Sequence, residues 1–159
     1  MSDTIENIYT LYNNPFLLSP IIVKFYEKYH GTQDKDILLS YLIFPIVLYE
    51  PSMICLLTKK KELRTFISYE KGPIKKHEKL YGLADRIDEY KEMTNLCIQY
   101  CVDNGNLKIG NDLSISFIKS EFKRDNTIVG YLKAAENMAI MLGKEKLSHI
   151  YLKLGIKKL

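Results

Sequence analysis

Two of the three cysteines in this 159-residue chain have the spacing that could place two metal ligands or nucleophiles together. Cys97 and Cys101 are one helical turn apart, so both thiols could face a single metal ion. A structural zinc site needs four ligands, and the sequence contains no CxxC or HExxH pattern to complete one. Both cysteines also continue an apolar stripe with Met93, and free cysteine is commonly buried as a small hydrophobe. The pattern therefore favours core packing over metal binding.

The remaining reactive residues do not predict a catalytic site. The histidines fall on three different expected helices, at His30, His77 and His149. Asp85 and the neighbouring pair 88–89 could serve as acid and base, but on an amphipathic, lysine-rich helix they are more simply solvated charges. The glycines are scattered singly, so no phosphate-binding loop and no ATP site is expected.

These observations favour a protein without enzymatic activity and without a cofactor. A small enzyme remains an alternative only if the fold assembles distant residues such as His77, Asp85 and Cys101 into one polar pocket.

Basic clusters are the clearest candidates for a binding surface. The net charge is +4, but residues 1–50 carry 3 lysines against 6 acids, and residues 51–159 carry 20 basic residues against 13 acids. The candidate contacts with nucleic acid or an acidic partner are Lys59, Lys60, Lys61, Arg64, Lys75 and Lys76, with Lys71, Lys79, Lys119, Lys123 and Arg124 nearby. They are not interleaved with stacking aromatic residues, so single-strand recognition is weakly supported. A solvated lysine-rich surface is the simpler alternative.

The helices that would position these residues follow from the 3.6-residue period. Residues 5–12 form one amphipathic stripe, and Asn14 and Pro15 predict the cap and first position of a second helix. Pro20 should kink or restart that helix, and Gly31 should end it. The N-terminal helical part spans about residues 4–69, and Gly72 and Pro73 break the chain after it.

Residues 37–49 are apolar on all sides, which indicates a helix in the middle of a core or at a partner interface. Asp36 is its expected cap, Pro45 should bend it, and Pro51 should stop it. The run is too short for a membrane span of about 20 residues. With an odd cysteine count and no signal pattern at the start of the chain, we expect a cytoplasmic protein with no membrane contact.

The second half of the chain predicts a winged-helix-like unit at about residues 74–118. Thr58 should cap a short basic helix before it. Helices near 74–88 and 91–103, with a turn in the charged stretch, would precede a β-hairpin near residues 107–117. Gly105 should close the second helix in a left-handed conformation. The second helix has only Lys91 as a cation, so it is poorly charged for reading DNA and fits a protein contact better.

Two C-terminal helices, at about residues 127–154, should complete the chain, with Gly143 and Gly155 at their ends. The sequence thus predicts a mainly α, helical single domain over residues 1–159, with a winged-helix-like helix-turn-helix and one hairpin.

Four segments together resemble a known family. They are residues 8–18 (IYTLYNNPFLL), 43–52 (IFPIVLYEPS), 101–109 (CVDNGNLKI) and 149–159 (HIYLKLGIKKL). In their order and spacing they resemble the middle component of bacterial three-component ABC systems, and the resemblance covers nearly the whole chain. The motif positions Asn14, Pro15, Pro45 and Pro51 have structural roles as a cap, a helix start, a bend and a stop.

The resemblance implies a role in defence against phage or plasmids. In such systems, as in Lamassu-type complexes, the middle component accompanies an SMC/Rad50-like ABC ATPase and an effector such as a nuclease. This chain would then be a non-catalytic adaptor that links the two, and it would meet DNA through the complex. The competing hypothesis from the residues is a winged-helix DNA-binding regulator.

Overall fold

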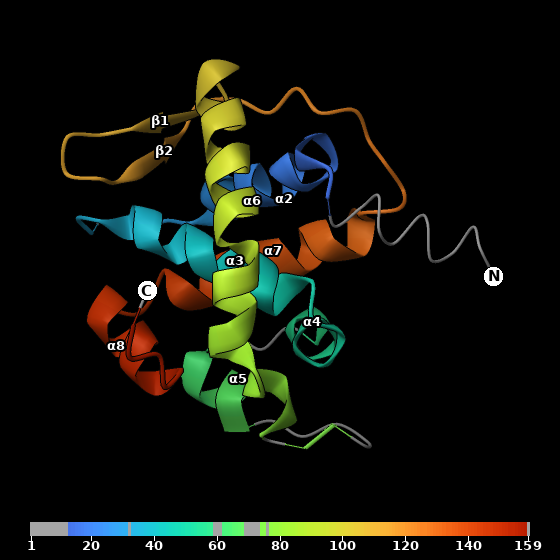
Figure 1. Ribbon diagram of the computed structural model, residues 1–159, viewed down its shortest axis with the longest axis vertical. Helices are drawn as coiled ribbons and strands as arrows, with labels where there is room; N and C mark the ends of the chain where they lie inside the picture. The colour runs from blue at the N-terminus through green and yellow to red at the C-terminus, as the bar shows by residue number, and fades with distance from the viewer. Residues whose placement is uncertain (1–12, 32, 59–61, 69–73, 76, 159) are drawn as a thin grey trace.

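The computed structural model describes residues 13–31, 33–58, 62–68, 74–75 and 77–158, and the expected helix at 5–12 lies outside them. This part of the chain is mainly helical with one hairpin, as predicted (Figure 1). The helices are α2 (Pro15–Lys28), α3 (Ser40–Val47), α4 (Glu50–Leu57), α5 (Leu63–Ser68), α6 (Leu83–Asp103), α7 (Val129–Leu142) and α8 (Leu147–Lys153). Two 3-10 turns, η1 (Asp36–Leu39) and η2 (Glu78–Leu80), and strands β1 (Leu107–Ile109) and β2 (Ile115–Phe117) complete the description.

Helix α2 starts as its sequence predicts. The Asn14 side chain accepts the backbone N–H of Phe16 at 2.9 Å, and Pro15 occupies the first turn, where a missing N–H costs nothing. Pro20 lies inside a continuous helix, so the expected restart is wrong. The helix also ends at Lys28, with Tyr29 as its C-cap, rather than at Gly31.

The apolar run 37–49 forms a corner rather than one bent helix. It is divided into η1 and α3, and α4 then leaves at an angle of 101° to them. Pro51 was expected to stop a helix, but it lies in the first turn of α4, where its fixed φ favours a helix start. Pro45 lies inside α3, so the corner falls after it, at Leu48 and Tyr49.

An arginine holds this corner. The Arg86 guanidinium of α6 lies 3.7 Å from the centre of the Tyr49 ring, and its Nε donates to the Pro45 carbonyl at 2.9 Å. Burial lowers the pKa of this guanidinium. Among the described residues no single helix has the length and composition of a membrane span. The two segments Asp36–Val47 and Glu50–Leu57 meet these criteria only when they are counted together across the corner.

Helix α6 is one uninterrupted helix of 21 residues, so the turn expected between residues 88 and 91 is wrong. Apart from Arg86, the charged residues of this stretch lie on the solvent side of the helix. Gly105 has a φ of 69°, and Asn106 donates its N–H to the Cys101 carbonyl at 2.8 Å, which ends the helix as predicted. The predicted winged-helix arrangement is not confirmed, because a single helix occupies the place of its second helix and of the turn before it.

The hairpin follows directly and matches the predicted strands. Leu107 pairs with Phe117 and Ile109 with Ile115 in an antiparallel register. Leu113 lies inside the predicted hairpin range but belongs to its turn, with a φ of 61°. The hairpin therefore places one buried residue of each strand, Leu107 and Ile115, against the helices.

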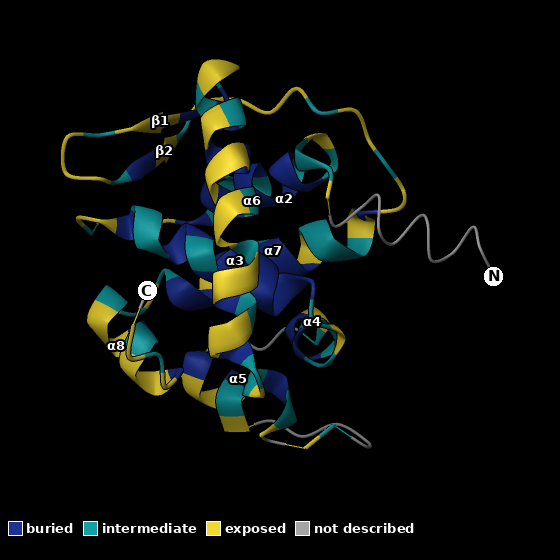
Figure 2. Ribbon diagram, viewed as in Figure 1, coloured by how far each residue is buried: buried dark blue, intermediate teal, exposed yellow. Residues whose placement is uncertain are grey.

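The core lies where α2 crosses α7 and where α3 crosses α6 (Figure 2). Phe25 of α2, Phe44 of α3 and Phe66 of α5 are completely buried members of this core. The Asn137 side chain on α7 donates to the Leu56 carbonyl at 2.8 Å and ties α4 to α7. Thr58 does not cap α5 as expected, because its hydroxyl donates back to the Cys55 carbonyl at 2.6 Å and closes α4.

Asp36 fastens the start of η1 to the hairpin and does not cap a helix as expected. Its carboxylate accepts the backbone N–H of Ile115 at 2.7 Å, and the residue is 3% exposed. The neighbouring amides of Lys35 and Ile37 donate to the carbonyls of Asp112 and Leu113 in the hairpin turn. Burial, with a smaller effect from Asp112, raises the pKa of the Asp36 carboxyl.

This raised pKa gives a pH-dependent prediction. The protonated Asp36 carboxyl stabilises the fold at pH values below its ordinary pKa of 3.8. This stabilisation is lost as pH rises through the higher pKa of the folded state. Asp36→Asn keeps an oxygen for the Ile115 amide without the buried charge, so its stability relative to the native chain should improve as pH rises from 4 to 7. Asp36→Ala leaves that amide unpaired and should cost about 1–3 kcal/mol. Urea unfolding across this range tests both, and a pH-independent difference between Asn and Asp would contradict the argument.

Candidate interaction surfaces

The two cysteines of α6 pack against α2, as predicted. Cys97 and Cys101 are both completely buried, and their thiols donate weakly to the carbonyls of Pro15 and Ser19 at 3.7 and 3.9 Å. Burial raises the pKa of Cys97 to about 12 and that of Cys101 to about 11, so both thiols stay protonated at neutral pH. In the described ranges no three His, Cys, Asp or Glu side chains are grouped to hold a metal ion.

The trio proposed for an enzymatic alternative is not assembled. Asp85 is exposed near the amino end of α6, whereas Cys101 is buried near its carboxyl end. Sixteen residues of helix separate them, which corresponds to about 24 Å at a rise of about 1.5 Å per residue. His77 is exposed just before η2.

Only part of the predicted basic cluster can be placed. Lys59, Lys60, Lys61, Lys71 and Lys76 lie outside the described residues. Arg64 and Lys75 are exposed, as a phosphate-contacting role would require. Lys79 is completely buried, and its ammonium group donates to the Phe66 carbonyl at 2.6 Å and lies 5.6 Å from the centre of the Phe66 ring. Lys79 therefore fastens η2 to α5 and is not a surface contact.

Arg64 lies at a groove between α5 and α8. The cavity measures about 530 Å³ and is lined by Arg64, Ile67, Ser68 and Lys153. Lys153 also pairs with Glu145 at 2.8 Å. This α5–α8 groove combines the apolar side chain of Ile67 with Arg64, which forms no ion pair among the described residues, so Arg64 is the cation there that is available to an acidic partner.

The outer face of α6 carries the opposite charge. Figure 2 shows this side exposed along most of the helix, a length of about 30 Å. The exposed side chains are Ala84, Asp85, Asp88, Glu89, Lys91, Glu92, Asn95, Leu96, Gln99 and Asp103. This α6 acidic face thus has five carboxylates and one lysine, and Leu96, at 56% exposure, lies among them. None of its charges forms an ion pair within the part of the chain that the structure describes.

A family model described as ABC-three component (ABC-3C) system Middle Component 3 matches residues 2–158. The chain belongs to this family. The match confirms the resemblance expected from the four sequence segments. No curated protein and no solved structure matches the chain.

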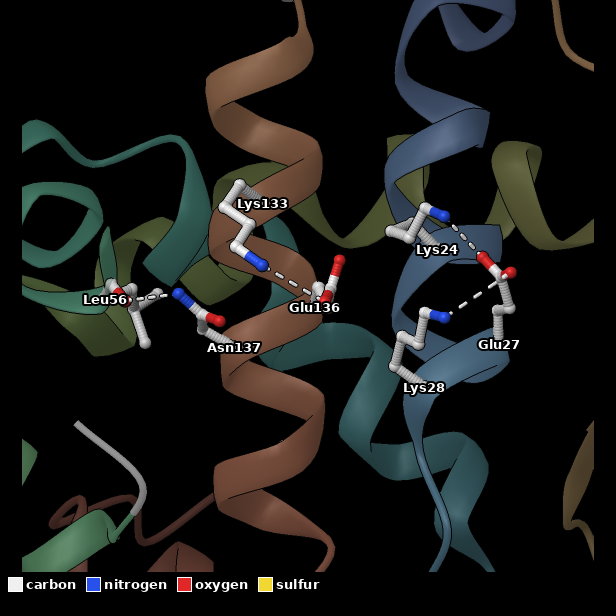
Figure 3. A network of polar contacts seen from close by, with 7 residues as sticks. All are labelled: Lys24, Glu27, Lys28, Leu56, Lys133, Glu136 and Asn137. Carbon is white, nitrogen blue, oxygen red and sulfur yellow. Dashed lines mark hydrogen bonds and ion pairs between the residues drawn. The ribbon is translucent and has the colours of Figure 1, made fainter. Parts of the chain in front are cut away.

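The Middle Component 3 chain has another charged surface, on α2 and α7, that differs from the α6 acidic face. Figure 3 shows Lys24 and Lys28 beside Glu27 on α2, at 2.5 and 3.8 Å, and Lys133 paired with Glu136 on α7 at 3.1 Å. These charges satisfy one another within each helix. A partner would have to break such pairs, so the α6 acidic face is the more available protein-binding surface.

The sequence contained the signal for this face. Asp85, Asp88, Glu89 and Glu92 follow the i, i+3, i+4, i+7 spacing that places side chains on one side of a helix. The expected turn in this stretch divided the pattern and concealed its continuity.

Proposed function

We propose that this Middle Component 3 chain is an adaptor that links an SMC/Rad50-like ABC ATPase to an effector such as a nuclease. The complex would act in the cytoplasm against phage or plasmids, in the manner of Lamassu-type systems, and this chain would catalyse no reaction itself. Membership of a middle-component family supports the proposal, because the family description implies that other components share the system.

The observation that carries the proposal is the α6 acidic face. Its carboxylates form no close ion pair among the described residues, and Leu96 supplies an exposed apolar contact among them. Such a face suits a basic protein surface, which would both pair the charges and cover the leucine. The α5–α8 groove offers a second surface with the opposite charge. An adaptor needs two separate contacts, and this pair supplies them.

Co-purification tests the proposal. The tagged chain should be expressed with the products of its neighbouring genes and isolated at moderate salt. We expect both an ATPase and an effector to be retained. A monodisperse monomer that retains neither neighbour would contradict the adaptor role.

A winged-helix DNA-binding regulator is the second candidate. The hairpin directly after α6 and the basic Arg64 at the α5–α8 groove favour it. The α6 acidic face argues against it, because phosphate contacts supply most of the affinity for DNA and carboxylates repel phosphate.

A direct binding measurement separates the two candidates. We expect the isolated chain to show no duplex binding at about 50 mM salt, where phosphate contacts are strong. Fluorescence anisotropy with a labelled duplex checks this, with Arg64→Glu and a triple Glu variant at Lys59, Lys60 and Lys61 as probes. Salt-dependent binding that these variants weaken tenfold or more would favour the regulator instead.

A further inference from the structure

A long connection crosses the amino end of α2. Residues 118–128, here called the strap, run from β2 to α7 without regular secondary structure and pass outside α2 (Figure 1). A cavity of about 570 Å³ lies between them. It is lined by Phe16, Leu17 and Pro20 of α2 and by residues 122–128 of the strap. This strap groove is separate from the α5–α8 groove and uses no residue of the α6 acidic face.

The strap is fixed at its ends and open in its middle. At the first end Ile118 donates its amide to the Asn106 carbonyl at 2.9 Å, and at the other end Ile128 is buried and its carbonyl accepts the amide of Leu132 in α7 at 2.9 Å. Within the described residues, the backbone groups of 120–124 neither donate nor accept a backbone hydrogen bond. A peptide that pairs with these groups would gain main-chain hydrogen bonds, the source of affinity when peptides bind along an open sheet edge.

Phe16 gives the strap groove an apolar anchor point. Its side chain is 62% exposed, whereas Phe25, Phe44 and Phe66 are completely buried. The ring meets Tyr100 of α6 edge-on, with centroids 5.0 Å apart, so it is held in place without being covered. Exposed aromatic side chains beside a cavity are typical of the central contacts of protein interfaces.

The charges beside the groove select the kind of partner. Lys123 and Arg124 are exposed and form no ion pair among the described residues, whereas Lys119 of the strap is paired with Glu121 at 2.9 Å. Two adjacent cations that have no ion pair in the described part of the chain, next to an apolar pocket, complement a segment that has an apolar side chain flanked by carboxylates.

We propose that the strap groove binds an extended segment of a partner protein in which a leucine or an aromatic residue is flanked by acidic residues. The apolar residue lies against Phe16 and Pro20, its backbone runs along residues 120–124, and its carboxylates pair with Lys123 and Arg124. This site goes beyond the adaptor role, because peptide binding at the strap groove requires neither the proposed ATPase nor the proposed effector.

A peptide screen on the isolated full-length chain tests the site. The probes are a randomised octapeptide display library and, separately, a single-stranded deoxyoligonucleotide. We expect enriched peptides to carry net negative charge around a leucine or aromatic residue. Their addition should shift backbone NMR signals at residues 16–20 and 120–128.

Variants locate the binding energy. Phe16→Ser and the pair Lys123→Glu and Arg124→Glu should each weaken the enriched peptide at least tenfold, whereas Lys157→Glu with Lys158→Glu, the same charge change at exposed positions elsewhere, should not. All of these positions are exposed, so folding should be retained, which circular dichroism verifies. The proposal is overturned if no acidic peptide is enriched, if the shifts map elsewhere, or if the oligonucleotide occupies the groove instead. The screen uses this chain alone, so its result does not depend on the co-purification experiment.

Discussion

Replacing Asp88 and Glu92 with lysine should reduce capture of a partner protein at least tenfold and leave the fold intact. Both residues are exposed on the same side of α6 as Leu96, so the change converts the centre of the α6 acidic face from negative to positive. A basic partner surface would then meet like charges, which are strongly unfavourable across an interface. Exposed substitutions away from special features usually change stability by less than about 0.5 kcal/mol.

The measurement is quantitative co-purification with the neighbouring components at two salt concentrations, together with thermal unfolding of each variant. The matched control is Asp34→Lys with Glu50→Lys, which makes the same charge change at exposed residues outside α6, the strap and the α5–α8 groove. Equal capture by the α6 variant and this control would show that the α6 acidic face is not the contact. A selective loss that added salt diminishes would support it.

Gln33→Ala should destabilise the chain by about 2–3 kcal/mol, because one side chain holds α8 to the segment after α2. Gln33 Nε2 donates to the Glu145 carbonyl at 2.9 Å and to the Tyr29 hydroxyl at 3.1 Å. Its Oε1 accepts the Leu147 amide, at the start of α8, at 2.7 Å. Alanine leaves that amide and the Glu145 carbonyl without these partners at a part-buried site.

Urea unfolding gives the stability change, and hydrogen exchange locates it. We expect amides of α8 to exchange faster in Gln33→Ala, and the α5–α8 groove to loosen with them. Gln33→Glu is the informative control at about pH 4, where its carboxyl is largely neutral, because it keeps an acceptor for the Leu147 amide and loses the amide donor groups. If Ala and Glu variants behave alike, the bond to the Leu147 amide contributes little.

The parts of the fold set by local chemistry could be predicted. Asn14 and Pro15 start α2 because a side-chain acceptor and a missing N–H suit the first turn wherever the helix packs. Gly105 ends α6 because a left-handed residue is needed there, and alternation of apolar residues specified the strands of the hairpin.

Predictions that depended on tertiary contacts were wrong. Pro51 and Thr58 each have two local readings, as the end of one helix or the start of the next, and packing of α4 against α7 decides between them. Asp36 has a side chain suited to a helix cap, but the hairpin amide of Ile115 comes within reach only in the folded chain. The continuous α6 was missed because a run of charges was read as a turn.

In the candidate surfaces, too, features set by local sequence could be predicted and features set by tertiary contacts could not. Arg64 could be predicted as exposed from its place on an amphipathic helix, and the structure adds Lys153 from a distant part of the chain. The sequence places Lys79 among lysines expected at the surface, and only the folded arrangement of η2 and α5 buries it. The strap groove joins residues about 100 positions apart, so no local pattern could have indicated it.

Native mass spectrometry of the complex purified from cells expressing the whole gene cluster tests the adaptor role most directly. The account predicts one assembly that contains the ATPase, the effector and this chain, and separation of the ATPase from the effector when the gene for this chain is deleted. An ATPase and effector that remain together without this chain would contradict the account.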